Sequence, residues 1–218
     1  MASHAGGATV PQPLPPLPTK FAALTFNVVY DLLLSKKLRW SAMCPVIDAA
    51  NHSSRAESDV AFEYFRNQFV LSTKGSHRAG DQVLISYGPQ GNDSLLQFYG
   101  FVEGGNPNDT YTLLGARVGG RSLDLTFGAK GGLTAESAAA ARGAQSDGPA
   151  LARELLAALE AERAALSTPL ADDERALRAA HLLGPRALLA TTFRAEKKRL
   201  LERCISKARK QVSKQAEG

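Results

Sequence analysis

The sequence predicts an α+β protein in which short β-strands and tight turns come first and α-helices come last. Residues 60–86 contain short runs of β-branched and aromatic residues separated by turn residues, a pattern typical of strands. Residues 150–215 instead repeat leucine and alanine at helical spacing. The 218-residue chain is 44% hydrophobic and 22% charged, which is enough apolar material for a folded core.

The amino-terminal region is predicted to begin with a disordered leader. Residues 1–20 are rich in Pro, Gly and Ala, and five prolines fall between Pro11 and Pro18. Residues 21–34 then place apolar side chains at helical spacing, which predicts a helix packed on one face.

Three strands are predicted next, over residues 60–65, 69–73 and 83–86. Arg66 and Asn67 lie between the first two runs and are expected to form a hairpin turn, and residues 79–81 supply a second turn before the third run. The predicted structure of this part is therefore a small set of antiparallel strands.

A short helix follows, and then the composition changes. Residues 91–93 are expected to cap a helix over Ser94–Tyr99 that stops at Gly100. Beyond residue 104 we expect two further strands, at 111–118 and 122–127. A Gly- and Ala-rich stretch, 128–148, is expected to separate these strands from the helices. Three helices are predicted at the carboxyl-terminal end, over residues 150–166, 172–183 and 186–215.

Charge and cysteine content exclude several classes of protein. The net charge of +5 comes from the end of the chain, where nine Lys or Arg stand against three Glu from Arg194 onward. A solvated helix with a basic end explains this better than a nucleic-acid site. Cys44 and Cys204 have no metal-spaced partners, so neither a disulfide framework nor a zinc site is indicated. No apolar run is long enough for a membrane span, so we expect a soluble intracellular protein, with cytoplasm, nucleus and plastid left open.

Two peptides carry the functional signal. Residues 45–53 read PVIDAANHS, and residues 85–88 read ISYG and are continued by NDSLLQFYGF at 92–101. Either peptide alone indicates no more than a capped turn or the end of a strand. Their order, their spacing and the turn RAGDQ at residues 78–82 between them make the pattern specific.

Together these peptides resemble the SET-domain protein methyltransferases, in particular the class of the plastid Rubisco large-subunit lysine methyltransferase and the actin-histidine methyltransferase. The later run RAEKKRLL at residues 194–201 is similar to a helix in the carboxyl-terminal domain of that class. The resemblance implies that residues 21–104 are the carboxyl-terminal half of a SET domain. It implies that residues 105–218 are a mostly helical substrate-binding domain.

The resemblance also implies a chemistry and a set of residues. It implies S-adenosylmethionine as the cofactor and lysine of a non-histone protein as the acceptor, with histidine left open. By resemblance Tyr87 is the catalytic tyrosine, Asn51 and His52 bind the cofactor, and Tyr99 and Phe101 line the substrate channel. A structural, half-buried histidine is an equally supported alternative for His52. No residue is expected to bind a metal.

One departure from that family pattern leaves two hypotheses open. A SET fold normally contributes a Gly-x-Gly turn that covers the cofactor, and no such peptide precedes Phe21. The first hypothesis is an active protein methyltransferase. The second is a catalytically silent SET remnant that serves as a protein-binding module. A titration with S-adenosylmethionine separates the two hypotheses, because only the enzyme requires the cofactor.

Overall fold

The chain forms two compact units, Met1–Ser86 and Tyr87–Gly218, and each is described by itself. The computed structural model describes residues 30–31, 39–40, 44, 46–66, 68–145 and 147–216. The leader expected at residues 1–20 lies outside these described residues. Short antiparallel strands and a helical carboxyl-terminal region confirm the α+β prediction. Within the described part of the chain, no helix combines the length and hydropathy that crossing a bilayer requires.

In the first unit, the helix predicted over residues 21–34 is wrong where the structure describes it. Tyr30–Asp31 form strand β1, which pairs antiparallel with β2 (Arg39–Trp40). The other residues of the predicted helix lie outside the described residues. Tyrosine has a high β-propensity, which favours a strand here, and the register places Tyr30 opposite Trp40.

The predicted hairpin is confirmed. Strand β3 (Ser58–Glu63) pairs antiparallel with β4 (Gln68–Thr73), and Glu63 lies opposite Gln68 at the closed end. The 3₁₀ turn η1 (Tyr64–Arg66) takes up part of the segment that was expected to continue the first strand. The rings of Phe62 and Phe69, which face each other across the pair, have centroids 5.0 Å apart.

The third strand predicted for this unit, over residues 83–86, is wrong except at one residue. Ile85 alone is bridged, in parallel with His52. The amide of Ile85 donates to the carbonyl of Asn51 at 2.9 Å, and the amide of Ser53 donates to the carbonyl of Ile85 at 3.0 Å. The chain turns at Ser54 directly after these bonds, so the pairing cannot extend into a ladder.

The second unit begins with the predicted short helix. Helix α1 (Asn92–Ser94) continues without a break into the π-helical segment η2 (Leu95–Tyr99). Gly100 ends it in the left-handed conformation, with φ +74°, and donates its amide hydrogen to the carbonyl of Leu96 at 3.2 Å. The predicted stop at Gly100 is therefore confirmed.

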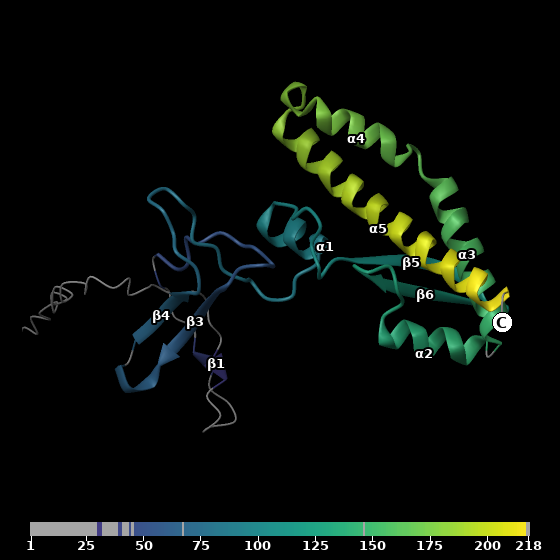
Figure 1. Ribbon diagram of the computed structural model, residues 1–218, viewed down its shortest axis with the longest axis horizontal. Coiled ribbons are helices and arrows are strands. Elements are labelled where there is room, and N and C mark those ends of the chain that lie inside the picture. The colour runs from purple at the N-terminus through teal and green to yellow at the C-terminus, as the bar shows by residue number, and fades with distance from the viewer. Residues whose placement is uncertain are drawn as a thin grey trace, which may run out of the picture. The chain divides into compact units, whose positions relative to one another are not determined.

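Next come a β-ribbon, which was predicted, and a helix, which was not. Strands β5 (Thr110–Val118) and β6 (Arg121–Gly128) pair antiparallel, close to the predicted bounds. Helix α2 (Ala135–Ala144) occupies the Gly- and Ala-rich stretch that was expected only to separate strands from helices. Alanine has the highest helix propensity, and the Thr134 side chain caps the helix by accepting from the amide of Ser137. Helix α2 packs against β6 (Figure 1).

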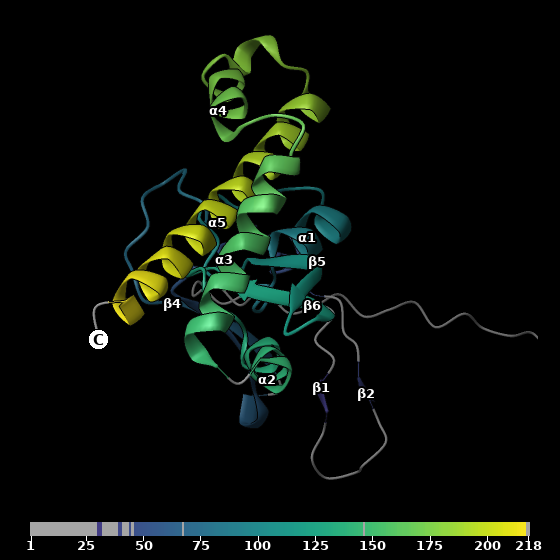
Figure 2. The same ribbon diagram turned by 90° about the vertical axis from the view of Figure 1, so that its right-hand side faces the viewer.

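Three helices complete the second unit. Helix α3 (Gly148–Ala165) and helix α5 (Pro185–Ala216) lie within two residues of the predicted bounds. The middle prediction, one helix over residues 172–183, is wrong in its extent, because α4 (Leu170–Arg178) stops and a 3₁₀ turn, η3 (Ala180–Leu182), follows. The backbone of Ala179, with φ −101° and ψ 34°, is no longer α-helical, so the helix ends before this residue. Helices α3 and α4 both lie along α5 (Figures 1 and 2).

The core of the second unit lies between the β-ribbon and the helices. Leu155 and Leu159 of α3 meet Leu200, Leu201 and Ile205 of α5 in one buried cluster. Side chains from the ribbon join the same cluster, namely Leu113, Ala116, Val118, Leu125 and Phe127. The first and third helices of this end therefore pack together through their leucine-rich faces.

Candidate active site

Three aromatic side chains that were predicted to act together lie in contact in the second unit. The ring of Tyr87 is centred 4.8 Å from that of Tyr99, with 38° between the ring planes. The ring of Tyr99 is centred 6.3 Å from that of Phe101, with 54° between the planes. Both separations are those of interacting aromatic pairs. We call Tyr87, Tyr99 and Phe101 the aromatic cluster; their chemical roles stay predictions.

The local backbone determines where these rings lie. Gly88, directly after Tyr87, has φ +90°, which lets the chain turn away sharply from the ring. Leu95 at the start of the π-helical segment is fully buried and anchors it. Gly100 then reverses the chain between Tyr99 and Phe101, so two residues that are close in sequence both contribute a ring. Single π-helical turns of this kind are rare and often occur at functional sites.

The environment of Tyr87 keeps its hydroxyl protonated. Burial raises the pKa of Tyr87 above its usual value, and the neighbouring phenol of Tyr99 raises it further. At neutral pH the Tyr87 hydroxyl can therefore both donate and accept a hydrogen bond. The side chain of Tyr99 is 47% exposed, so a molecule in solvent can reach the edge of the cluster.

A buried asparagine holds the helix that carries Tyr99. Asn92 is fully buried, and its amide nitrogen Nδ2 donates to the Asp109 carboxylate and to the Glu103 carbonyl, both at 3.1 Å. Its Oδ1 accepts from the Glu103 amide at 2.9 Å, and its backbone amide donates to Asp109 Oδ1 at 3.0 Å. All the hydrogen-bonding groups of this side chain are used, so the start of α1 is fixed against the loop that precedes β5.

Helix α5 supports the same segment from the other side. Lys197 Nζ donates to Asp109 Oδ1 and to the carbonyl of Thr110, both at 2.8 Å, and also pairs with Asp93 of α1. The carboxylate of Glu196 accepts from the amide of Gly105 at 3.0 Å. The long helix thereby positions both the helix that carries Tyr99 and the loop after Phe101.

The neighbouring charges of α5 are also used inside the unit. Arg194 and Lys198 both donate to the Asp173 carboxylate of α4, each at 2.6 Å. Arg199 pairs with Glu196 and with Glu174, at 2.6 Å and 3.1 Å. The run at residues 194–201, which carried the resemblance to a substrate-binding domain, therefore ties α4, α5 and the α1 segment together.

The predicted cofactor residues lie in the first unit. Asn51 is exposed, its Nδ2 donates to Gln82 Oε1 at 2.8 Å, and its backbone carbonyl takes part in the bridge to Ile85. His52 is half-buried, and the bridge uses the backbone groups of its two neighbours and none of its own. The predicted turn between the two motifs is present, since Asp81 accepts from the Arg78 amide at 2.7 Å and Gly80 has φ +93°.

Sequence reasoning did not identify the network of Asn92, Asp109 and Lys197 as part of the site. Asp109 follows the turn residues Asn106-Pro107-Asn108, which read as an ordinary loop. Two signals were available in the sequence: an acidic residue, Asp109, directly before a β-rich run, and a basic helix later in the chain that could supply its partner. Among the described residues, no three His, Cys, Asp or Glu side chains are grouped so that they could hold a metal ion.

Comparison with known proteins links part of the chain to SET-domain proteins. Human SET domain-containing protein 4 is 34% identical over 67 residues, which cover 31% of this chain and 15% of the relative, and its mouse counterpart is 36% identical over the same shares. The ribosomal lysine N-methyltransferase set11 of Schizosaccharomyces pombe is 32% identical over 68 residues, 30% of this chain and 17% of that protein. The matched part thus spans less than a fifth of these relatives. The chain matches no protein-family model. This partial-length homology supports a SET domain in the chain.

Proposed function

We propose that this chain carries the substrate-channel part of a SET-type protein N-methyltransferase that uses S-adenosylmethionine and modifies a lysine of a non-histone protein. The observation that carries the proposal is the contact of Tyr87 with Tyr99 and of Tyr99 with Phe101. These are the residues to which the resemblance assigns the catalytic and channel roles. The homology to SET-domain proteins, one of them named a lysine N-methyltransferase, supports the same reaction.

The aromatic cluster suits methyl transfer to an amine. The cofactor supplies, when bound, an electrophilic methyl group on a sulfonium cation. Loss of water on entering an apolar channel, together with the positive charge of a sulfonium, disfavours a charged lysine and so favours the neutral amine, although the free pKa of lysine lies near 10.4. The protonated Tyr87 hydroxyl can accept a hydrogen bond from that amine and orient its lone pair. The proton lost by the lysine leaves to solvent, which reaches the edge of the cluster at Tyr99.

The first unit offers groups that fit the polar part of S-adenosylmethionine. Asn51 is exposed, and while its Nδ2 donates to Gln82, its Oδ1 remains able to accept from an ammonium group. The Gln82 contact fixes the orientation of the Asn51 amide. His52 would contribute through its backbone, which the bridge to Ile85 holds in an extended form.

The second unit would receive the protein substrate. We infer that residues 105–218 form a substrate-binding domain like that of the Rubisco large-subunit class. The ion pairs from α5 to the α1 segment support this inference, because they join the helices rigidly to the residues that carry the aromatic cluster.

The decisive experiment measures methyl transfer by Tyr87→Phe. This variant keeps the ring contact with Tyr99 and removes only the hydroxyl, so turnover should fall about 10- to 1000-fold while melting temperature and cofactor affinity stay near those of the parent. The assay is radiolabelled methyl transfer from S-adenosylmethionine to a protein extract.

A matched control is Tyr111→Phe, which removes a hydroxyl that donates to Glu162 at 2.7 Å in the helical part of the unit. Tyr111→Phe should change the stability of the folded chain but leave turnover near that of the parent. Full activity in Tyr87→Phe refutes the catalytic tyrosine. A parent chain that neither binds S-adenosylmethionine nor transfers a methyl group refutes the enzyme and leaves the protein-binding module.

A second experiment tests the cofactor side. Titration calorimetry with S-adenosylmethionine should show binding that is about tenfold weaker in Asn51→Ala, because the variant removes one hydrogen-bonding amide worth about 1.4 kcal/mol. Tyr87→Phe serves as the control with unchanged affinity. Equal affinity in Asn51→Ala and the parent excludes Asn51 as a cofactor ligand.

A further inference from the structure

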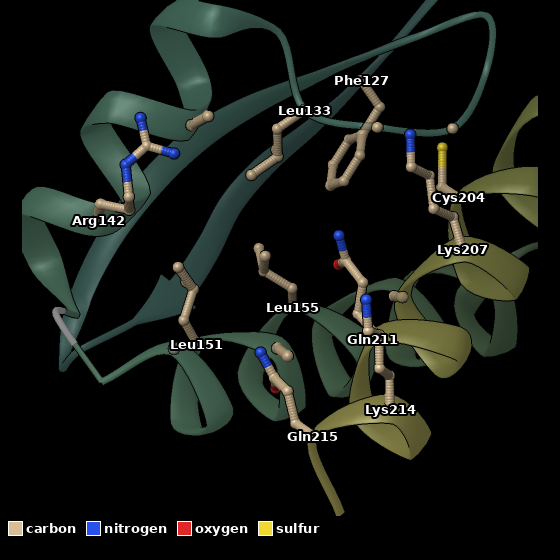
Figure 3. A pocket seen from close by; sticks show the side chains of 16 residues that line it. Phe127, Leu133, Arg142, Leu151, Leu155, Cys204, Lys207, Gln211, Lys214 and Gln215 are labelled. Carbon is tan, nitrogen blue, oxygen red and sulfur yellow. The ribbon is translucent and has the colours of Figure 1, made fainter. Parts of the chain in front are cut away.

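A cavity of about 460 Å³ lies in the second unit, away from the aromatic cluster. Its walls come from the end of β6, from α2, from the start of α3 and from the last turns of α5. Figure 3 shows Leu133, Leu151, Leu155 and the ring of Phe127 pointing into the space. The size lies in the range of pockets that bury a small ligand or a few side chains of a peptide.

The polar groups of this cavity are all cationic or neutral. Arg142 of α2 and Lys207 and Lys214 of α5 line it, together with two glutamines, Gln211 and Gln215 (Figure 3). Among the described residues that line it, none is Asp or Glu. An apolar interior with an uncompensated positive rim attracts a ligand that is apolar on one side and acidic on the other.

Two cations of the rim, Lys207 and Lys214, lie on α5 and differ from most other basic residues of that helix. Arg194, Lys197, Lys198, Arg199, Arg203 and Arg209 each make a hydrogen bond or an ion pair with another part of the unit. In the part of the chain that the structure describes, Arg142, Lys207 and Lys214 make no side-chain hydrogen bond or ion pair. Within the described residues, the three cations that face the cavity therefore have no such partner, whereas most basic residues along α5 are paired with other parts of the unit.

One wall of the cavity packs closely on α5. A Cβ on Gly131 would fall 2.6 Å from the backbone carbonyl oxygen of Arg203, so the loop that carries Gly131 lies directly against the helix backbone. The backbone of this wall is therefore in place before a ligand binds. A preformed cavity costs less ordering when a ligand binds.

We propose that this cavity binds an acidic, amphipathic peptide segment of a partner protein, with aliphatic side chains among Leu133, Leu151 and Leu155 and carboxylates against Arg142, Lys207 and Lys214. Nucleic acid fits less well, because its phosphates would leave the leucine walls without a partner. This inference rests on the proposed function in one respect: it assigns the segment to the protein that accepts the methyl group. Binding itself requires neither cofactor nor methyl transfer.

The test uses fluorescence anisotropy with the full 218-residue chain and two synthetic labelled helical peptides. Both peptides carry leucines at positions i, i+3, i+4 and i+7; one has glutamates and the other glutamines at the remaining positions. We expect saturable binding of the glutamate peptide and at least tenfold weaker binding of the glutamine peptide. Raising the salt concentration should weaken the binding of the glutamate peptide and leave that of the glutamine peptide unchanged.

Charge variants locate the binding site. Lys207→Gln combined with Lys214→Gln should weaken the binding of the glutamate peptide about tenfold or more. Both side chains are exposed, so the double variant should keep the stability of the parent. Lys210→Gln is the matched control, because Lys210 is an exposed lysine of the same helix that does not line the cavity. Its affinity for the peptide should equal that of the parent.

Three results overturn the proposal. These are equal binding of the two peptides, equal loss of affinity in the Lys210 control and the double variant, and saturable binding of dodecanoate with none of the glutamate peptide. The last result would assign the cavity to a small anionic amphiphile. Peptide binding without methyl transfer would count against the proposed enzyme alone, whereas methyl transfer without peptide binding would count against the cavity alone.

Discussion

Lys197 donates a hydrogen bond to Asp109 at 2.8 Å, and 14% and 3% of their respective side-chain surfaces remain exposed. The ammonium also lies 5.3 Å from the centre of the Phe193 ring. This pair joins the long helix α5 to the residue directly before β5, 88 positions earlier in the chain. Through Asn92, which donates to the same carboxylate, it also supports the segment that bears Tyr99.

We predict that Lys197→Met destabilises the second unit by about 3 to 5 kcal/mol, because it leaves the Asp109 carboxylate buried without its cation. The double variant Lys197→Met, Asp109→Asn should recover part of this loss, since no uncompensated charge remains. Urea unfolding measures these two variants and the single variant Asp109→Asn, and far-ultraviolet circular dichroism follows it because the long helices lie in this unit. Simple addition of the two single effects would show that the residues are not coupled.

We predict that Leu201→Ala costs about 2 to 5 kcal/mol of unfolding free energy. Leu201 is buried between α3 and α5, so the truncation leaves a cavity in the main cluster. Lys210→Ala on the same helix should be nearly neutral because its side chain is exposed. Equal melting temperatures for Leu201→Ala and the parent would contradict the packing.

The elements that the sequence predicted well are those determined by local pattern. The two long helices have apolar stripes and prolines in their first turns, and the hairpin of β3 and β4 has a turn between two β-rich runs. Gly100 was identifiable because a helix stop favours glycine. In each of these cases neighbouring residues alone contain the information.

The failures came from interactions between distant residues. Residues 83–86 have strand propensity, yet the one β-bridge described for them is that of Ile85, because the opposing chain turns after Ser53. Helix α2 was missed because its glycine-containing, alanine-rich sequence has only a weak amphipathic pattern. The contacts among Tyr87, Tyr99 and Phe101 were expected only by resemblance, and the supporting pair of Lys197 and Asp109 has no local signal.

We predict that Asp173 makes stability depend on pH in the acid range. Burial alone would raise the pKa of Asp173, but hydrogen bonds from Arg194 and Lys198 lower it below the usual value. A lowered pKa in the folded state means that the stabilisation is present above the unfolded pKa, near 3.9, and is lost as pH falls through the folded value.

The variant Asp173→Asn tests this dependence. At pH 7 it should be less stable than the parent, because buried Lys198 loses its carboxylate partner and keeps the hydroxyl of Thr168, a neutral group. The difference should begin to shrink as the pH falls below about 4, because the carboxylate then takes up a proton in the unfolded parent while the folded parent still holds it charged, and it should continue to shrink until the pH lies below the lowered folded pKa. Thermal unfolding at a series of pH values measures it, and a difference that does not change with pH would exclude the ion pair as its cause.

The last prediction compares two glycines with the same backbone angle. Gly131 has φ +74° and Gly120 has φ +75°, so alanine at either position meets a similar backbone penalty of about 1 kcal/mol. A Cβ on Gly131 would lie 2.6 Å from the carbonyl oxygen of Arg203, whereas a Cβ on Gly120 would meet nothing within 4 Å. Gly131→Ala should therefore cost about 1 to 3 kcal/mol more than Gly120→Ala, because the loop must move away from α5. Urea unfolding of the two variants measures the difference directly. Gly131 also lines the cavity between α2 and α5, so Gly131→Ala should weaken the binding of the glutamate peptide, whereas Gly120→Ala should leave it unchanged. Equal unfolding free energies for the two variants would show that the loop does not pack closely on the helix.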